Sequence, residues 1–512
     1  MLLPRRARHL DGWSRGGDRR GYGSKGNQIP VEVYDNLYKE FNPTKYNAQE
    51  WVAIAQAAGM KYMILTSRHH DGFSMFDTQA NDYKITSPDS PFRRDVVKEL
   101  ADAAHAAGMH FGVYYSQPNW QHPDAFTPDR HTNYLAYLKT QVRELLTHYG
   151  QIDVIWFDGL GKSAQDYDSV ALNQMIRELQ PRILINNRNG QSQDFDTPEQ
   201  RVGKFQNDRP WESCITICHQ WAWKPNDTMK SLQECLRTLV TCAGGDGNLL
   251  FNVGPMPTGE IEPRQVERLK EMGAWLKLYG DSVYATRGGP FKPGKWGAST
   301  FKGNTVYLHV FNWPAEGLTL PALGKKILAT KTLTGGQAEV KQTEPGLAVT
   351  LPPADRQAID TVIALQLDGP ASELPPVALS GGGGSLAEGK KATASSYYQK
   401  QNYYAARAAF DGDAETRWAT DAGTKQAWLE VDLGKPETFS RVRIDEWDGH
   451  QRIQSFELQA KNGDDWRTFY KGTTIGANWE QKFEPVTTRI VRLNILNATD
   501  GPTINEFELF AK

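Results

Sequence analysis

The sequence predicts a multidomain protein that consists of an irregular (β/α) barrel, an antiparallel β-sandwich and a β jelly-roll module. Apolar strand-like runs alternate with helix-like runs over residues 61–279, which is typical of βα units. From about residue 289, short alternating segments indicate antiparallel sheets. A Pro- and Gly-rich stretch then indicates a flexible linker. We therefore expect the barrel over residues 1–288, the β-sandwich over 289–370, the linker over 371–385 and the module over 386–512.

The expected helices at 46–59 and 94–108 end at a glycine, and an apolar strand-like run follows each of them. The expected helices cover residues 46–59, 94–108, 131–149, 167–179, 229–243 and 262–279. The expected strands cover residues 61–66, 110–116, 154–157, 183–186, 213–217 and 248–253. A regular barrel has about eight strands. The barrel is therefore irregular, or one strand lies within residues 1–30, which show no clear period.

Composition and charge exclude several classes of protein. The net charge of the 512 residues is −2, so no electrostatic argument supports binding to nucleic acid or to an anionic membrane. The chain contains no apolar run of membrane-spanning length, and its first residues lack the apolar core of a signal peptide. Four cysteines lack the CxxC spacing of zinc or redox sites; we interpret them as buried thiols, with one disulfide as the alternative: Cys214, Cys218, Cys235 and Cys242.

Polar and aromatic side chains follow the expected strands rather than precede them. Asp158 stands where the strand 154–157 ends, and the carboxyl ends of barrel strands carry the chemistry. We interpret Asp158 as a nucleophile; the alternative is an aspartate that caps a helix or a turn. The side chains expected on the same rim are His69, His70, Tyr114, Asp158, Arg188, Glu199 and Trp221.

Two carboxyl groups are what a glycosidase needs, and the sequence offers a partner for Asp158. Glu199 lies in a polar loop from which it could protonate a leaving group, whereas Glu212 lies beside a strand and could instead be structural or orient the substrate. Sugar hydroxyls could be bound by His69, His70, Tyr114 and Arg188, and an apolar sugar face by Trp221. A metal-dependent hydrolase that uses His69, His70 and Asp158 is an alternative, although no HxH or HExxH spacing appears.

Several motifs together resemble one family. They are Asn42-Pro-Thr-Lys-Tyr-Asn, Arg68-His-His-Asp-Gly-Phe, Gly112-Val-Tyr-Tyr-Ser, Ile155-Trp-Phe-Asp-Gly, Asn187-Arg188, Thr197-Pro-Glu, Trp211-Glu and Gly247-Asn-Leu-Leu-Phe-Asn-Val-Gly-Pro. On these motifs residues 31–285 resemble the α-L-fucosidases of glycoside hydrolase family 29. The resemblance implies a retaining exo-hydrolase of fucosylated oligosaccharides or glycoconjugates, without a catalytic cofactor.

The resemblance also implies roles for individual residues. Asp158 matches the nucleophile, Glu199 the favoured acid/base and Glu212 the alternative acid/base. The fucose-binding positions are matched by His69, His70, Tyr114, Arg188 and Trp221, and Trp13 is added from the segment Trp13-Ser-Arg-Gly. The segment 31–38 and the pair Ser67-Arg68 resemble the branch that acts on α-1,3/1,4-linked fucose of Lewis-type glycans.

The N-terminus departs from this family. Its members open with a strand that ends in His-Trp-Gly, and residues 1–12 contain no such motif. If that strand is truly missing, the chain is expected to bind fucosylated glycans without hydrolysing them.

The last 127 residues resemble the discoidin-like carbohydrate-binding modules of family 32. The resemblance lies in Ala409-Phe-Asp-Gly-Asp413, Thr416-x-Trp418, Trp428-Leu-Glu-Val-Asp-Leu-Gly434 and Asn505-Glu-Phe-Glu. It implies a structural Ca²⁺ ion held by Asp411, Asp413, Thr416 and Glu506, and a galactose-type glycan near Trp447, His450 and Arg452. The domain architecture implies a periplasmic or secreted protein, although the sequence shows no signal peptide.

Overall fold

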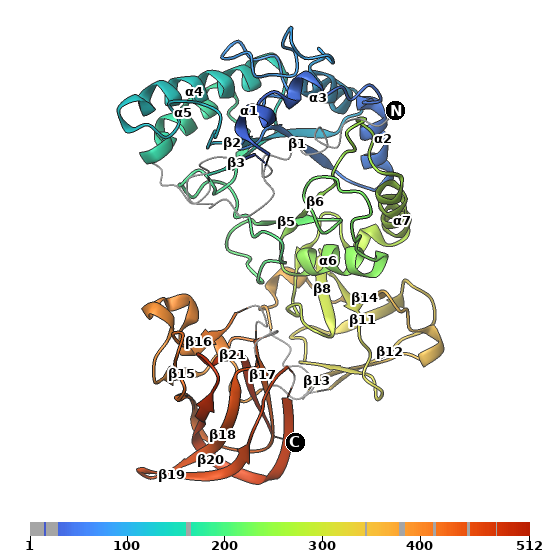
Figure 1. The fold of residues 1–512 in the computed structure, drawn as a ribbon. Coiled ribbons are helices and arrows are strands. Elements are labelled where there is room, and N and C mark those ends of the chain that lie inside the picture. The colour runs from blue at the N-terminus through green and yellow to red at the C-terminus, as the bar shows by residue number, and fades with distance from the viewer. Residues whose placement is uncertain are drawn as a thin grey trace. The chain divides into compact units, whose positions relative to one another are not determined.

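The chain divides into two compact units, residues 1–378 and 379–512, which we describe separately (Figure 1). The computed structural model describes residues 15–16, 29–159, 165–343, 346–377, 385–412, 416–447, 451–477 and 479–511. Trp13, Asp413 and His450 lie outside these ranges. Within the described part of the chain, no helix is long and apolar enough to cross a membrane.

The first unit begins with alternating parallel strands and helices. The strands β1 (Tyr62–Arg68), β2 (His110–Ser116), β3 (Val154–Asp158) and β4 (Leu184–Ile185) form a parallel sheet in that order. A second parallel pair consists of β5 (Glu212–Thr216) and β6 (Asn248–Asn252). Over the described residues β1 and β6 are edge strands of separate sheets, so a closed barrel stays a prediction. The six strands expected over this region are confirmed.

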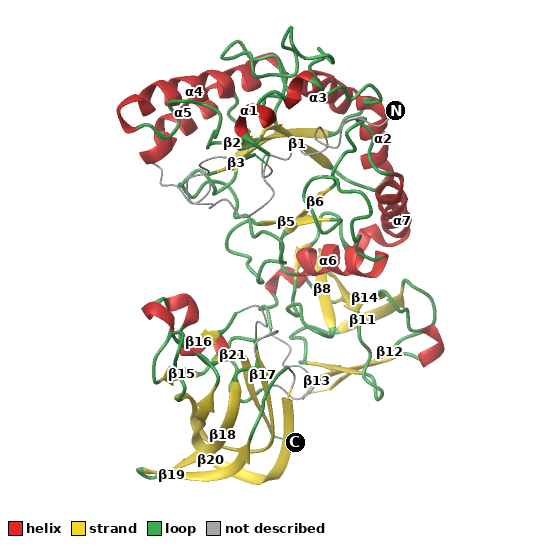
Figure 2. Cartoon of the chain, in the orientation of Figure 1, coloured by secondary structure: helices red, strands yellow, loops and turns green. Residues whose placement is uncertain are grey.

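Most helices of the βα region lie outside its parallel strands (Figure 2). The helix at residues 232–244 instead packs between these strands and the antiparallel strands that follow. The helices are α1 (Val31–Tyr34), α2 (Ala48–Ala57), α3 (Val96–Ala106), α4 (His131–His148), α5 (Ser169–Leu179), α6 (Leu232–Gly244) and α7 (Pro263–Tyr279). Local sequence defines where three of them begin. The side chains of Asn47 and Asp95 accept hydrogen bonds from the first turns of α2 and α3, and Ser231 forms a capping box with Glu234 at α6.

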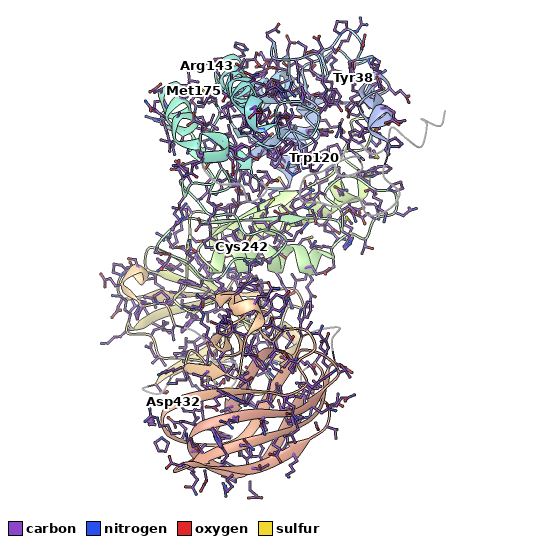
Figure 3. The ribbon with its side chains drawn as sticks, turned by 60° about the vertical axis from the view of Figure 1, so that its left-hand side comes forward. Tyr38, Trp120, Arg143, Met175, Cys242 and Asp432 are labelled. Atoms are coloured by element: carbon purple, nitrogen blue, oxygen red, sulfur yellow. The ribbon has the colours of Figure 1, made fainter. Side chains whose placement is uncertain are left out.

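The core of this unit lies between the sheet and its helices. Phe111, Val113, Ile155 and Phe157 on the central strands are fully buried. The four cysteines are buried free thiols, which confirms the interpretation drawn from their spacing. Cys242 lies in the interior on α6 (Figure 3), where burial raises the pKa of its thiol to about 12. A thiol in that environment stays protonated and packs as a small apolar group.

Two antiparallel sheets follow, as the alternating pattern predicts. The larger sheet consists, in spatial order, of β11 (Ile327–Thr332), β14 (Thr361–Leu367), β9 (Thr305–Val310), β8 (Gly297–Lys302) and β7 (Arg287–Gly288). The smaller sheet consists of β10 (Leu318–Leu320), β13 (Gly346–Thr350) and β12 (Glu339–Thr343). The first part of the expected linker also packs here, because Ala371 is buried and Val377 donates to the Pro290 carbonyl.

The second unit is a seven-stranded, antiparallel sheet structure. Its strands are β15 (Lys391–Ala394), β16 (Trp418–Ala419), β17 (Ala427–Glu446), β18 (Ile453–Asn462), β19 (Asp465–Gly472), β20 (Trp479–Ala498) and β21 (Thr503–Phe510). The long strand β17 contains a register shift between Asp432 and Glu437 in its pairing with β20. Trp418, Phe439 and Phe507 are among its fully buried residues.

Candidate active site

Asp158 is fixed at the end of β3 by its neighbours on both sides. The buried Asn186 side chain accepts from the Phe157 amide and donates to the Phe157 carbonyl, both at 2.9 Å. The short strand β4 ends at Ile185. The Asn186 side-chain amide therefore continues the hydrogen bonding between β3 and β4 by one further residue. A Cβ at Gly159 would lie 2.3 Å from the Arg188 carbonyl oxygen, which explains the glycine after Asp158.

The Asp158 carboxylate is surrounded by groups that hold it in one orientation. Tyr114 donates its hydroxyl to Asp158 Oδ2 at 2.9 Å, and burial together with Asp158 holds the pKa of that phenol well above its usual value. Tyr114 therefore stays a hydrogen-bond donor. Arg188 Nη1 lies 3.8 Å from Asp158 Oδ1. The aspartate side chain is 17% exposed, so one side of the carboxylate faces the cavity.

His70 lies behind Asp158 and is held as a neutral imidazole. Its Nδ1 lies 2.6 Å from Ser116 Oγ, and that hydroxyl donates to the Pro118 carbonyl at 2.8 Å. The serine oxygen is then left to accept, so we assign the imidazole proton to Nδ1. Burial, followed by His69 and Arg68, lowers the pKa of His70 well below its ordinary value. The unprotonated Nε2 lies 3.6 Å from Asp158 Oδ2, and a sugar hydroxyl that bridges them could donate to either.

Arg188 connects the two carboxylates that the sequence paired. Its Nη1 lies 2.6 Å from Glu199 Oε2, and Thr197 accepts from Nε and Nη2 at 2.9 and 3.0 Å. Because the same nitrogen contacts both acids at 3.8 and 2.6 Å, the two contacting oxygens are at most about 6.4 Å apart. That bound is compatible with the close carboxyl pair, about 5 Å, of a retaining glycosidase.

Glu199 is more firmly placed than a loose polar loop would allow, which corrects the description drawn from the sequence. Its backbone pairs with Cys214 of β5, where Gln200 donates to the Cys214 carbonyl and Cys214 donates to the Pro198 carbonyl, both at 2.9 Å. The Glu199 side chain is nevertheless 43% exposed. The acid therefore stands on an ordered segment and still faces solvent.

Glu212 occupies a different environment. It is the first residue of β5 and is only 5% exposed. Its Oε1 accepts from Trp156 Nε1 at 3.0 Å and its Oε2 accepts from the Tyr62 hydroxyl. Burial raises the pKa of Glu212 to about 7, although both hydrogen bonds oppose that change. A raised pKa suits a general acid, but both oxygens of this carboxyl group are already engaged.

A cavity of about 1530 Å³ brings most of the predicted site residues together. The predicted residues that line it are His69, Tyr114, Asp158, Arg188, Glu199 and Trp221. His70 reaches the same site through Asp158. The cavity continues between the edge strands β1 and β6, where Met63, Leu65 and Phe251 give it an apolar wall. Of the predicted fucose contacts, Trp13 lies outside the described residues.

Three contributors to the site were missed from the sequence. Asn186 and Ser116 are the last residues of expected strands, and Trp156 lies within another expected strand. A polar residue at the last position of a barrel strand was the available signal for the first two. The orientation of Trp156 depends on tertiary contacts with Tyr114, Arg188 and Glu212, for which the sequence alone gives no signal.

In the second unit, part of the predicted metal set is close together. Thr416 Oγ1 donates to Asp411 Oδ1 at 2.7 Å and lies 3.1 Å from the Ala408 carbonyl. The ring centroids of Phe410 and Phe507 are 5.4 Å apart. Because these residues are the sequence neighbours of Asp411 and Glu506, the two segments lie side by side. Among the described residues of the chain, no three His, Cys, Asp or Glu side chains are grouped so that they could hold a metal ion. Asp413 is not among those residues.

Comparison with known proteins agrees with this geometry. The model of the α-L-fucosidase family matches residues 19–281, and that of the F5/8 type C domain matches residues 391–509. The chain is 31% identical to an α-L-fucosidase of Branchiostoma floridae over 366 residues, which cover 64% of this chain and 79% of the relative. The structure of α-L-fucosidase isoenzyme 1 from Paenibacillus thiaminolyticus is similar with a TM-score of 0.62 at 35% identity, covering 66% of this chain and 91% of that one.

A second solved structure bears on the chemistry. It is a family 29 α-L-fucosidase from Bacteroides thetaiotaomicron, trapped as a covalent intermediate with 2-fluoro-fucosyl fluoride in a mutant that carries glutamine in place of one glutamate. Its TM-score is 0.61 at 27% identity, and the match covers 67% of this chain and 86% of that one. The motifs, the paired carboxylates and these matches lead to one conclusion: the chain belongs to the α-L-fucosidase family of glycoside hydrolases and carries a C-terminal F5/8 type C domain.

Proposed function

We propose that this α-L-fucosidase removes terminal α-linked L-fucose with retention of configuration, with Asp158 as nucleophile and Glu199 as acid/base. The observation that carries this assignment is the contact of one Arg188 nitrogen with both carboxylates. It keeps them within the span of one glycosidic bond. The covalent intermediate trapped in the Bacteroides thetaiotaomicron relative supports the retaining course.

The reaction then follows from the positions of these groups. In the first step an Asp158 oxygen attacks the anomeric carbon, the bond to the glycosidic oxygen breaks, and Glu199 gives that oxygen its proton. In the second step Glu199 takes a proton from water, the water oxygen attacks the anomeric carbon, and the bond to Asp158 breaks. Each step inverts the anomeric centre, so the product keeps the α configuration.

The surrounding residues orient the sugar and the nucleophile. Tyr114 donates to one Asp158 oxygen, so the other oxygen, toward Arg188, is the better placed to attack. His70 offers an unprotonated Nε2 beside Asp158 that can accept a hydrogen bond from a sugar hydroxyl. Trp221 packs against the apolar cluster that includes Trp156, and such a wall suits the methyl group of a 6-deoxy sugar.

Linkage preference is the finer part of the proposal. The resemblance of residues 31–38 and of Ser67-Arg68 supports action on α-1,3/1,4-linked fucose of Lewis-type glycans. Lewis-type and 2′-fucosylated oligosaccharides should be hydrolysed side by side and the released fucose followed by proton NMR. We expect α-fucose first and faster release from the Lewis-type substrate. Initial release of β-fucose would contradict retention, and faster release from the 2′-fucosylated substrate would contradict the linkage. Binding without turnover of either would favour a glycan-binding protein.

Replacement of Asp158 tests the nucleophile itself. Asp158→Gly should lower kcat by at least about 10³-fold, because it removes the carboxylate that forms the ester intermediate. Azide can enter the space of the lost carboxylate, so it should restore turnover and give β-fucosyl azide. Circular dichroism should show an intact fold. Loss of activity without azide rescue in a folded variant would contradict the assignment.

For the C-terminal module we propose a structural Ca²⁺ ion and a galactose-type glycan ligand. Asp411, Thr416 and Glu506 supply the hard oxygen atoms that Ca²⁺ prefers, and Thr416 and Glu506 are each 6% exposed. Bound there, the ion would link Asp411 and Thr416 to Glu506 of β21. The Arg417 guanidinium lies 3.8 Å from the Trp447 ring centroid, which offers a planar surface and hydrogen-bond donors to a sugar.

The calcium site and the glycan surface are tested separately on the whole chain, by calcium titration and by lactose binding. Ca²⁺ should raise the unfolding temperature of the wild-type chain, and Asp411→Asn should reduce that rise without changing fucosidase activity. Lactose binding, measured by calorimetry, should weaken in Trp447→Ala. An unfolding temperature that does not respond to Ca²⁺ would contradict the metal site, and unchanged lactose binding would contradict the glycan surface.

A further inference from the structure

Glu212 is a buried carboxyl group that contacts the interior side of the active site. It lies between Tyr62 of β1 and Trp156 of β3, and each of its oxygens accepts from one of them. Cys214, two residues further along β5, is where Glu199 pairs with this strand. Strands rise by about 3.3 Å per residue, so Glu212 lies one layer of side chains beneath Glu199.

Trp156 is the residue through which Glu212 can affect that upper layer. Its indole ring stacks on the Tyr114 ring with centroids 5.6 Å apart and an angle of 21° between the planes. The Arg188 guanidinium lies 4.5 Å from the centre of the same indole ring. A rotation of this ring would therefore move both of its neighbours.

Those two neighbours are the residues that orient the catalytic acids. Tyr114 donates to Asp158, and Arg188 contacts both Asp158 and Glu199. The orientation of the indole is fixed at one point, where its N–H meets the Glu212 carboxyl group. Without that acceptor the buried N–H would be unsatisfied, and the ring would turn to find another partner.

We propose that Glu212 is a positioning residue: it orients Trp156, which in turn holds Tyr114 and Arg188 against the two catalytic carboxylates. The inference rests on the proposed roles of Asp158 and Glu199 and explains why a second glutamate lies so near them. Glu212 exchanges no proton with the substrate, because its oxygens are engaged beneath the Trp156 ring.

Two substitutions of Glu212 distinguish positioning from acid/base catalysis. Glu212→Gln keeps an oxygen that can accept from Trp156, so kcat with a fucosylated oligosaccharide should stay within about threefold of wild type. Glu212→Leu keeps the size and removes the acceptor. It should lower kcat by about 10- to 100-fold with a smaller change in KM, because misplacement of catalytic groups weakens the transition state most. An equal, large loss in both variants, absent with an aryl fucoside of low leaving-group pKa, would make Glu212 the acid/base and overturn the proposal.

Trp156→Phe removes the donor of the hydrogen bond between Trp156 and Glu212, and it has a matched control. Trp51 is also buried and donates its indole N–H at 3.0 Å, the same distance, but to the Gly259 carbonyl. Trp156→Phe should lower kcat as Glu212→Leu does, and the double variant should lose no more than either single one. Trp51→Phe should leave kcat unchanged. Equal effects of the two Trp→Phe substitutions, or additive losses in the double variant, would contradict the inference.

A binding measurement keeps the test independent of turnover. Calorimetry with a fucose-shaped iminocyclitol should show about 10-fold weaker binding to Trp156→Phe, the variant to use if Glu212→Leu does not fold. Binding to Trp51→Phe should be unchanged, and equal binding to both would overturn the proposal. If the wild-type chain bound this compound but hydrolysed no fucoside, the proposed function would fail while the positioning role was still measured.

Discussion

The rim of the site and the layer beneath it hold two glutamates of one chain in opposite environments. Glu199 pairs with the middle of β5, contacts a guanidinium and has a side chain that is 43% exposed. Glu212 begins the same strand, is 5% exposed and accepts from two uncharged donors. An acid/base must exchange protons with substrate and water in each cycle. Access to substrate and solvent therefore identifies the catalytic carboxyl group better than a raised pKa does.

The largest loss of activity that distinguishes the two glutamates is expected at Glu199. Glu199→Gln should lower kcat/KM for a fucosylated oligosaccharide by about 10²- to 10⁴-fold, because the leaving oxygen then departs without a proton. With 2,4-dinitrophenyl α-L-fucoside the first step should be almost unaffected. Azide should react with the accumulated intermediate and give α-fucosyl azide. Oligosaccharide hydrolysis at the wild-type rate in Glu199→Gln would contradict the assignment of Glu199 as the acid/base.

A smaller loss is expected when Arg188 is shortened. Arg188→Lys keeps the charge but cannot contact Thr197 and both carboxylates together, so kcat/KM should fall by about 10- to 100-fold. Arg177→Lys is the matched control, since Arg177 forms a 2.5 Å ion pair with Asp194 and its side chain is 33% exposed. It should retain wild-type kinetics. Similar losses in the two variants would mean that Arg188 acts through stability alone.

The buried carboxyl group should also appear in the pH dependence of stability. The pKa of Glu212 is raised from 4.5 to about 7 in the folded chain, so the folded state binds more protons than the unfolded state between these pH values. Stability from this group is present below pH 4.5 and is lost as the pH rises through 7, by about 3 kcal/mol at most. Glu212→Gln should therefore gain stability relative to wild type between pH 5 and pH 8 in urea unfolding. A difference that does not change with pH would contradict this environment.

The smallest expected effect concerns the support of Asp158. Asn186→Ala leaves the Phe157 amide and carbonyl without their side-chain partner, which should cost about 1–3 kcal/mol of unfolding free energy. Asn36→Ala removes a single exposed bond to the Glu32 carbonyl and should cost less than about 0.5 kcal/mol. Urea unfolding followed by tryptophan fluorescence compares the two. Equal stability of the two variants would show that Asn186 adds nothing to the end of β3.

Much of this arrangement follows from patterns in the sequence. The six barrel helices are where apolar period and caps predict them, within about three residues at each end. Asp158 and Arg188 meet because one ends β3 and the other follows β4 of the same parallel sheet, whereas Glu199 is brought to them by its pairing with β5. The bounds of the short or polar strands β8, β10, β12 and β19 could not be predicted, since their pairing is decided by tertiary contacts rather than by local pattern.

The sequence pattern could not decide which of the two glutamates is the acid/base. Both follow a proline or tryptophan and precede a polar residue, so local sequence does not separate them. Their difference is depth along β5 and the partner each oxygen meets, and these depend on how β3 and β5 face one another. That β1 and β6 are edge strands over the described residues and both line the cavity is likewise a property of the fold.

The most direct test of the central claim is to locate the fucosyl group on the enzyme. The chain would be treated with 2-fluoro-fucosyl fluoride, digested and mapped by tandem mass spectrometry. We predict a single 2-fluoro-fucosyl ester on the peptide that contains Asp158, with accumulation favoured in Glu199→Gln and absent in Asp158→Gly. An ester on Glu199, Glu212 or any other residue, or hydrolysis of natural substrate with no ester formed, would contradict the account.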